Sequence, residues 1–171
     1  VRADADDRMY RLKKRASGNG AVMNEHIPNE VNGMRYLLGI DIGTSGTKTV
    51  LFDERGAALA SFTGEYGMAQ PQNGWAEQDP RDWWRAVQSG IRSVLAQTGV
   101  DNRAVAGVGL SGQMHGLVML DKAGAVLRPS IIWCDQRTQK QCDEIEARVG
   151  HERLVQITAN PALTGFTAGK I

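Results

Sequence analysis

The chain has 171 residues, of which 42% are hydrophobic, and its formal net charge is +1. This length can build one domain with a substantial core. The near-neutral charge argues against nucleic acid or a membrane surface as a partner, and no apolar run approaches the roughly 20 residues of a membrane span. Two cysteines, Cys134 and Cys142, do not make a disulfide framework, so a reducing, cytoplasmic location is predicted.

Residues 1–34 show no sustained helical or strand period. The basic run Lys13-Lys14-Arg15 is not followed by the apolar segment that a signal peptide needs. We therefore expect residues 1–34 to be a disordered extension or a mis-assigned start. Residues 35–171 are expected to form the domain.

A β-hairpin is predicted between residues 37 and 52, where two β-prone runs flank a turn made of Gly, Thr and Ser. The first strand ends in a carboxylate, Asp41. Gly43 and Gly46 in the turn can adopt positive φ angles and allow a ligand to approach the backbone closely.

The chemistry of this turn suits a phosphate group. Thr44 and Ser45 offer hydroxyls and N–H groups, which can form a concavity that binds anions, and Lys48 adds a cation. The nearby carboxylate of Asp41 suits Mg²⁺, which prefers one or two carboxylates together with waters and phosphate oxygens. From these residues alone, a purely structural hairpin is an equally good interpretation.

A third strand is predicted at residues 57–66, after a turn at residues 53–56. A helix is predicted to begin after Asp79, a natural N-cap that is followed by Pro80, and to end at Gly99. Its apolar face, which we expect to pack into the core, comprises Trp83, Trp84, Val87, Ile91, Val94 and Leu95.

Beyond this helix, residues 104–110 read as a buried strand, and the intervening helix makes a parallel crossover. Residues 117–121 are predicted to form another strand, closed by a turn at residues 122–124. Residues 131–133 are expected to continue the sheet or its edge, and residues 138–149 to be helical.

Gln113, Met114 and His115 follow the predicted strand at its carboxyl end, where open α/β sheets bind their ligands. An imidazole and an amide can both donate to and accept from sugar hydroxyls. Judged by position alone, a structural role for His115 is equally compatible with the sequence.

Five segments together resemble the FGGY family of carbohydrate kinases, and the similarity extends over residues 36–171. These segments are residues 39–46, 75–80, 112–116, 133–137 and 165–168. The first segment is typical of the wider superfamily, the second of the family, and the third of the members that act on D-xylulose. In the fourth segment, Cys134 departs from the Asn that is common at its position.

The resemblance implies a ribonuclease-H-like α/β fold of the actin, Hsp70 and sugar kinase superfamily, with a mixed sheet that opens with antiparallel strands. It also implies transfer of the γ-phosphoryl group of ATP, with Mg²⁺, to a hydroxyl of D-xylulose. The family's catalytic base, an Asp, would lie beyond Ile171, and the C-terminal domain would be absent. We therefore expect a truncated N-terminal domain, inactive alone, from an enzyme that could form a homodimer.

The resemblance also implies roles for individual residues. Asp41 would organise Mg²⁺, directly or through water, and the ATP phosphates would contact Asp41, Gly43, Thr44, Ser45 and Lys48. The sugar would contact Gln113, Met114, His115, Asp135 and Arg137. Two alternatives remain: a family member that acts on ribulose, gluconate or glycerol, and a non-catalytic nucleotide-binding module of the same superfamily.

Overall fold

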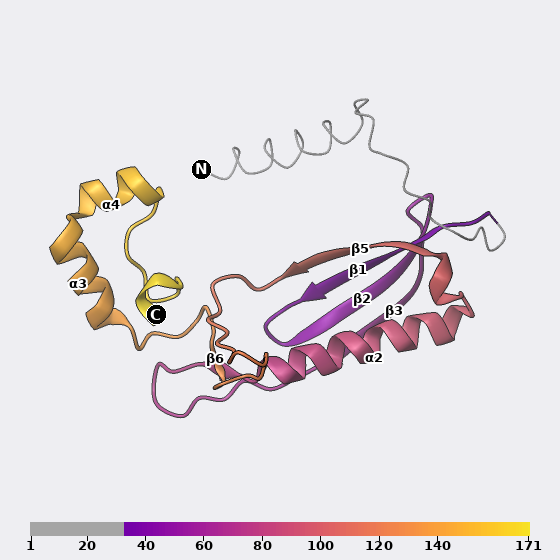
Figure 1. The fold of residues 1–171 in the computed structure, drawn as a ribbon, viewed down its shortest axis with the longest axis horizontal. Coiled ribbons are helices and arrows are strands. Elements are labelled where there is room, and N and C mark those ends of the chain that lie inside the picture. Colours follow the sequence, from indigo (N-terminus) through magenta and orange to yellow (C-terminus); the bar gives the residue numbers. More distant parts are fainter. Residues whose placement is uncertain (1–32) are drawn as a thin grey trace.

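The computed structural model describes residues 33–171, and the expectations for residues 1–32 lie outside that range. Strands β1 (Tyr36–Ile42) and β2 (Gly46–Asp53) form the predicted antiparallel hairpin. β3 (Ala58–Glu65) pairs with β2, also as predicted. β5 (Val105–Gly112) pairs in parallel with β1, which gives a four-stranded mixed sheet in the order β3-β2-β1-β5 (Figure 1).

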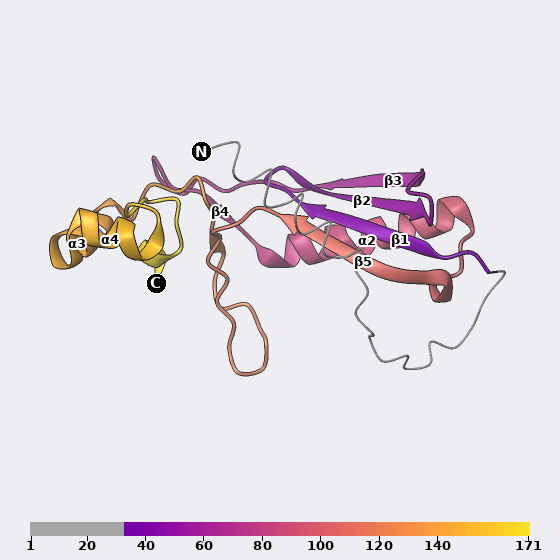
Figure 2. The ribbon, with the colours of Figure 1, turned by 90° about the horizontal axis from the view of Figure 1, so that it is seen from above.

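Helix α2 (Pro80–Thr98) begins and ends as the sequence predicts. The Asp79 side chain accepts a hydrogen bond from the N–H of Arg81, and Gly99 closes the helix with a left-handed φ of 68°. The helix runs along one face of the sheet, where it packs on β1, β2 and β3 (Figure 2).

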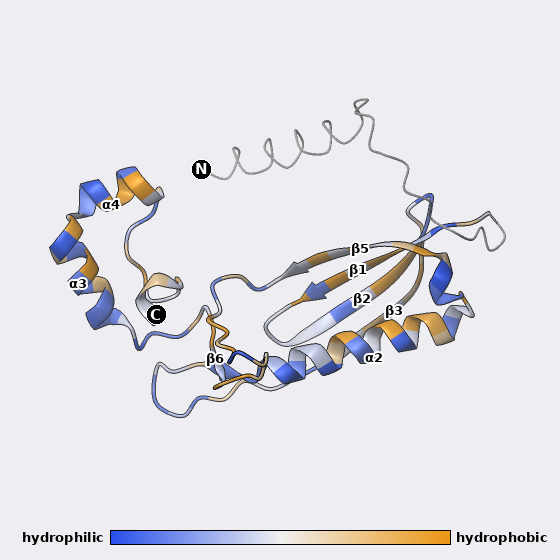
Figure 3. Ribbon diagram, in the orientation of Figure 1, coloured by the Kyte–Doolittle hydropathy of each residue, from blue (hydrophilic) through white to orange (hydrophobic). Residues whose placement is uncertain are grey.

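The core of this layer lies between α2 and the sheet, around Leu38, Leu51 and Val94. In Figure 3, hydrophobic residues follow most of β1 and the part of β2 away from the hairpin turn, while α2 alternates between hydrophobic and hydrophilic segments. Gly90 brings the helix close to β2, because a Cβ atom there would lie only 2.2 Å from the Oγ1 atom of the buried Thr49.

Two expectations about burial were wrong. Trp84 was placed on the apolar face of the helix, yet it is 62% exposed, and the face toward the sheet instead uses the small residues Ala86 and Gly90. The strand at residues 104–110 was expected to be buried, yet Val108 is 55% and Leu110 is 73% exposed. The reason is that α2 covers β2 and β3, while β5 forms the edge of the sheet.

The segment after β5 also differs from expectation. Residues 117–121 are not a strand but make only isolated bridges, Leu117 to Ile131 and Leu120 to Val126, around the predicted turn. β6 (Ser130–Ile131) does not continue the main sheet, because it pairs with β4 (Glu77–Gln78) in a separate two-stranded sheet.

The last part of the described chain is helical. Short 3₁₀ turns occur at η1 (Asn102–Ala104) and η2 (Ala168–Lys170). The predicted helix is present as α3 (Gln139–Val149), and a second helix that was not predicted, α4 (His151–Thr158), follows Gly150. Helices α3 and α4 both lie beyond the carboxyl ends of β1 and β5 (Figures 1 and 2).

Between residues 33 and 171, no helix combines the length and apolar character needed to span a membrane.

Candidate active site

The turn between β1 and β2 is held from two sides. The N–H of Gly43 donates to the carbonyl of Gly46 at 3.0 Å, and the hydroxyl of Tyr66 donates to the carbonyl of Gly43 at 2.6 Å. Within residues 33–171, no group accepts a hydrogen bond from the N–H of Thr44 or Ser45. These two donors are therefore available to an anion.

Burial raises the pKa of Tyr66, against the effect of a hydrogen bond with Thr47, and the negative charge of Asp41 raises it further. The phenol therefore stays protonated and remains a donor to the turn at neutral pH.

Asp41 lies near the end of β1, opposite Lys48 of β2 and beside Ser111 of β5. Its side chain makes no ion pair or hydrogen bond with any residue that the structure describes, and it lines a hollow of about 350 Å³ on the open sheet face together with Lys48. The carboxylate is free to contact a bound group.

Gln113 connects the phosphate turn to the end of β5. Its N–H donates to the carbonyl of Ile42 at 2.7 Å, and its side-chain amide donates to Gln78 at 2.8 Å and to the carbonyl of Gly43 at 3.3 Å. Gln78 in turn donates to the carbonyl of Thr44 at 2.7 Å. Gln113 therefore holds the turn in place as well as facing the cavity beside it.

Trp133 forms a wall of this cavity. Its Nε1 atom donates to the hydroxyl of Thr44 at 3.0 Å, and its side chain is 48% exposed. The cavity has a volume of about 380 Å³ and lies at the carboxyl ends of β1 and β5. It is lined by Asp41, Gly43, Thr44, Gly112, Gln113, Met114 and Trp133.

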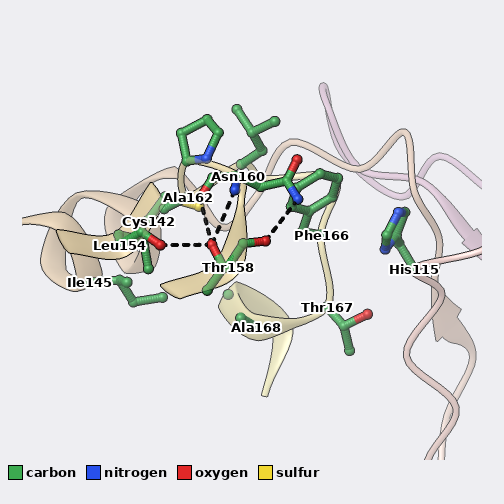
Figure 4. Close-up of a pocket in the computed structure, with 13 residues that line it drawn as sticks. His115, Cys142, Ile145, Leu154, Thr158, Asn160, Ala162, Phe166, Thr167 and Ala168 are labelled. Carbon is green, nitrogen blue, oxygen red and sulfur yellow. Dashed lines mark hydrogen bonds between the residues drawn. The ribbon is translucent and has the colours of Figure 1, made fainter. Parts of the chain in front are cut away.

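Met114 and His115 point to different places. Met114 lines the cavity with Asp41, whereas His115 lines a second, largely apolar cavity of about 420 Å³. His115 has a left-handed φ of 66°, and its ring packs against Phe166 with 4.6 Å between the ring centroids. Figure 4 shows His115 at the margin of this second cavity, whose other walls come from α3, α4 and residues 160–169.

Asp135 and Arg137 form a buried ion pair. Asp135 is fully buried, and it accepts hydrogen bonds from Arg137 at 2.7 Å and from the N–H of Ala76 at 2.6 Å. Arg137 also donates to Glu77 at 2.7 Å and covers the ring of Trp75, whose centroid is 3.7 Å away. Neither residue lines the cavities described above.

The electrostatics of this pair favour its charged form. Burial alone would raise the pKa of Asp135, but the hydrogen bonds from Arg137 and from the N–H groups of Ala76 and Arg137 hold that pKa below its ordinary value. Burial would likewise lower the pKa of Arg137, but its bonds to Asp135 and Glu77 raise it. The pair attaches the segment after Trp133 to the segment before α2.

The structure brings together only part of the predicted site. Asp41, Gly43, Thr44, Gln113 and Met114 share one cavity. Ser45 lies at the exposed tip of the turn, and Lys48 faces the neighbouring hollow that also contains Asp41. His115, Asp135 and Arg137 lie outside the cavity of Asp41.

Sequence reasoning assigned no role to Gln78 and Trp133. The available signal was their membership in two of the family-like segments, residues 75–80 and 133–137. Their hydrogen bonds to Thr44 come from residues that lie 34 and 89 positions away in the chain.

The donor set fits a hard, oxygen-ligated cation rather than a metal held by several side chains. Within residues 33–171, no group of three or more His, Cys, Asp or Glu side chains could hold a metal ion. Asp41 is the sole carboxylate among the residues that line the 380 Å³ cavity. One carboxylate is enough for Mg²⁺ that is completed by waters and phosphate oxygens, but not for a structural zinc site.

The N-terminal domain of the FGGY family of carbohydrate kinases matches residues 36–171. This chain belongs to that family. The predicted resemblance and the α/β fold are thereby confirmed.

Among other FGGY-related proteins, the xylulose kinase of Klebsiella pneumoniae is 42% identical over 134 residues, which are 78% of this chain and 27% of that protein. The crystal structure of a xyloylose kinase from Brucella ovis has a TM-score of 0.74 at 40% identity, over 80% of this chain and 28% of that one. The crystal structure of gluconate kinase from Lactobacillus acidophilus has a TM-score of 0.70 at 31% identity, over 77% of this chain and 26% of that one. The chain thus spans little more than a quarter of these proteins.

Proposed function

We propose that the FGGY kinase that contains this domain transfers the γ-phosphoryl group of ATP to D-xylulose, with Mg²⁺, to give D-xylulose 5-phosphate. The observation that carries this proposal is the shared cavity, in which the phosphate turn faces Met114 and Trp133 at the carboxyl ends of β1 and β5. Similarity to the xylulose kinase of Klebsiella pneumoniae supports the choice of sugar.

The phosphate half of the site uses backbone and charge. The free N–H groups of Thr44 and Ser45 donate to phosphate oxygens, and Lys48 adds positive charge nearby. Asp41 would hold Mg²⁺, and the bound ion would neutralise phosphate charge. Positioning of the reactants and neutralisation of the phosphate charge are the two main contributions that a protein makes to phosphoryl transfer.

The sugar half of the site uses Met114 and Trp133 as apolar walls and Gln113 as a polar contact. His115 follows Met114 in the chain but lines the second cavity in this structure, and its contact with the sugar is the part of the proposal that the second test below examines. Asp135 and Arg137 hold the Trp133 segment instead of contacting the sugar, because their polar atoms are already engaged within the protein.

In the reaction, the hydroxyl oxygen of the sugar forms a bond to the γ-phosphorus while the bond from that phosphorus to the β–γ bridging oxygen breaks. ADP leaves, and the hydroxyl proton passes to a base. The residues described here bind and orient the two reactants. Both cysteines are free thiols, which supports a reducing, cytoplasmic setting for this reaction.

Gluconate is the second candidate substrate, supported by the similarity to the Lactobacillus acidophilus gluconate kinase. Gluconate carries a carboxylate, which a binding site normally meets with a cation. No Lys, Arg or His lines the 380 Å³ cavity among the residues that the structure describes. The lining therefore favours an uncharged sugar.

The first test compares D-xylulose, D-ribulose, gluconate and glycerol in a coupled assay for ADP release by a full-length kinase that carries this domain. D-xylulose should give the highest kcat/KM. Asp41→Ala should lower kcat by at least about 100-fold, as removal of a preorganised charge contact does, while the KM for D-xylulose stays within about threefold. Glu54→Gln, in an exposed turn, is the matched control. Loss of sugar affinity with an unchanged kcat would contradict the role of Asp41.

The second test addresses His115. His115→Ala should raise the KM for D-xylulose about tenfold, which corresponds to the roughly 1–3 kcal/mol cost of an unmet polar group. His151→Ala, on the exposed surface of α4, is the control and should leave KM unchanged. If His115→Ala also leaves KM unchanged, His115 serves only to pack against Phe166.

A further inference from the structure

Lys170 carries a buried ammonium group that is not neutralised by a neighbouring carboxylate. The residue is only 8% exposed, and within residues 33–171 it forms no ion pair. Its Nζ atom instead donates three hydrogen bonds to backbone carbonyls: to His115 at 2.8 Å, to Ile132 at 3.0 Å and to Gly165 at 2.8 Å. A lysine ammonium has three N–H donors, so its hydrogen-bonding capacity is fully used.

We propose that Lys170 is a positioning residue that anchors three segments beside the sugar half of the site: the two that carry Met114 and Trp133, and the segment of Phe166, which packs on His115. The inference rests on the proposed function for the identity of the sugar, and on geometry for the anchoring itself. The three carbonyls belong to segments that are far apart in the chain. The first carbonyl belongs to His115 itself, the second precedes Trp133, and the third precedes Phe166, the residue that packs on His115.

The backbone at His115 explains why an anchor is needed. A left-handed φ of 66° is unfavourable for a residue with a side chain, because the Cβ atom comes close to the following carbonyl oxygen. Such a conformation persists only where its surroundings determine it. The bond from Lys170 holds the His115 carbonyl from inside, while Phe166 packs against the imidazole ring from the other side.

The charge state of Lys170 matters to this role. Burial lowers the pKa of Lys170, while the negative charge of Asp135 raises it and the positive charge of Arg137 lowers it. The three bonds require the ammonium form, because a neutral amine has only two N–H groups. Arginine cannot substitute for it, because a planar guanidinium does not present three donors to three carbonyls around one nitrogen.

The experiment uses the full chain labelled with ¹⁵N and with ¹³C in the methionine methyl groups. Lys170→Met and Lys170→Arg should both move the indole N–H signal of Trp133 and the methyl signal of Met114. Signals from the core between α2 and the sheet, such as the amide signal of Leu51 in β2, should not move. Lys140→Met, an exposed lysine of α3, is the matched control and should move none of them. Unmoved Trp133 and Met114 signals in folded Lys170→Met would overturn the inference.

A measurement on the unsubstituted chain decides the matter if the variants do not fold. The Lys170 ammonium should give a slowly exchanging signal, with couplings through its hydrogen bonds to the carbonyl carbons of His115, Ile132 and Gly165. A rapidly exchanging ammonium without those couplings would refute the anchor.

Kinetics of the full-length kinase separate this inference from the proposed function. Lys170→Met should raise the KM for D-xylulose by about tenfold or more while the KM for ATP changes less than about twofold. An unchanged KM for D-xylulose would overturn the link to the sugar site. An unsubstituted kinase that is inactive on D-xylulose would refute the proposed function alone, because the NMR signals still decide whether Lys170 anchors the three segments.

Discussion

The interior between α2 and the sheet is mostly apolar, around Leu38, Leu51 and Val94, and its buried polar residues, Thr47 and Thr49, are uncharged. The segments around β4, β6 and η2 instead bury several polar and charged side chains. We call the first the sheet layer and the second the loop layer. The buried polar residues of the loop layer are Glu77, Gln78, Ser130, Asp135, Thr138, Thr164 and Lys170.

The two layers differ in how strongly they fix the orientation of individual side chains. Apolar burial in the sheet layer has no preferred direction, so it stabilises the sheet without fixing the orientation of particular side chains. The hydrogen bonds and ion pairs of the loop layer are directional, so they can fix the segments that carry Met114 and Trp133. The cost is that loss of a single partner leaves a buried charge or carbonyl unsatisfied.

The largest effect on stability is expected from the buried ion pair. Asp135→Asn should lower the free energy of unfolding by about 3–5 kcal/mol, because it leaves the Arg137 guanidinium buried without its main partner. Asp82→Asn removes an exposed ion pair with Arg85 and should cost about 0–1 kcal/mol. Urea unfolding of both variants provides the measurement, and equal losses would show that the loop layer does not depend on this pair.

A somewhat smaller loss is expected from overpacking the sheet layer. Gly90→Ala places a Cβ atom against the buried Thr49 side chain, which must shift, and should cost about 1–3 kcal/mol. Ser89→Ala, at an exposed position of the same helix, should be neutral or slightly stabilising. Thermal unfolding compares the two, and a stabilised Gly90→Ala variant would contradict the close approach of α2 to β2.

Acid should weaken the loop layer before the sheet layer. Because the pKa of Asp135 in the folded chain lies below its ordinary value of 3.8, its contribution is fully present above that value and is lost as the pH falls through the lowered pKa. Hydrogen exchange between pH 5 and pH 2.5, corrected for intrinsic rates, should show amides near Ala76 and Arg137 losing protection while β1 and β2 amides keep theirs. Parallel loss in both layers would argue against a separate acid response.

The smallest effect is expected at Trp84. Because this side chain is 62% exposed, Trp84→Gln should change the free energy of unfolding by less than about 0.5 kcal/mol. Urea unfolding again provides the measurement. A loss of several kcal/mol would restore the original expectation that Trp84 belongs to the core.

The elements that could be predicted from the sequence are those with local signals. The cap at Asp79, the stop at Gly99 and the glycines of the hairpin turn act through residues only a few positions away. The phosphate turn and the position of Gln113 at the carboxyl end of β5 also follow from neighbours in the chain together with the order of the strands.

The tertiary structure decided the rest, because the deciding contacts join distant residues. Helical periodicity put Trp84 on the apolar face, but only the lateral placement of α2 over β2 and β3 determines which side chains are covered. The family resemblance implied that Asp135 and Arg137 contact the sugar, yet the folded chain pairs them in the interior, where Arg137 also meets Glu77, 60 residues away. Nothing in the local sequence places Lys170 beside His115, since only the folded chain brings its ammonium to carbonyls from three separate segments.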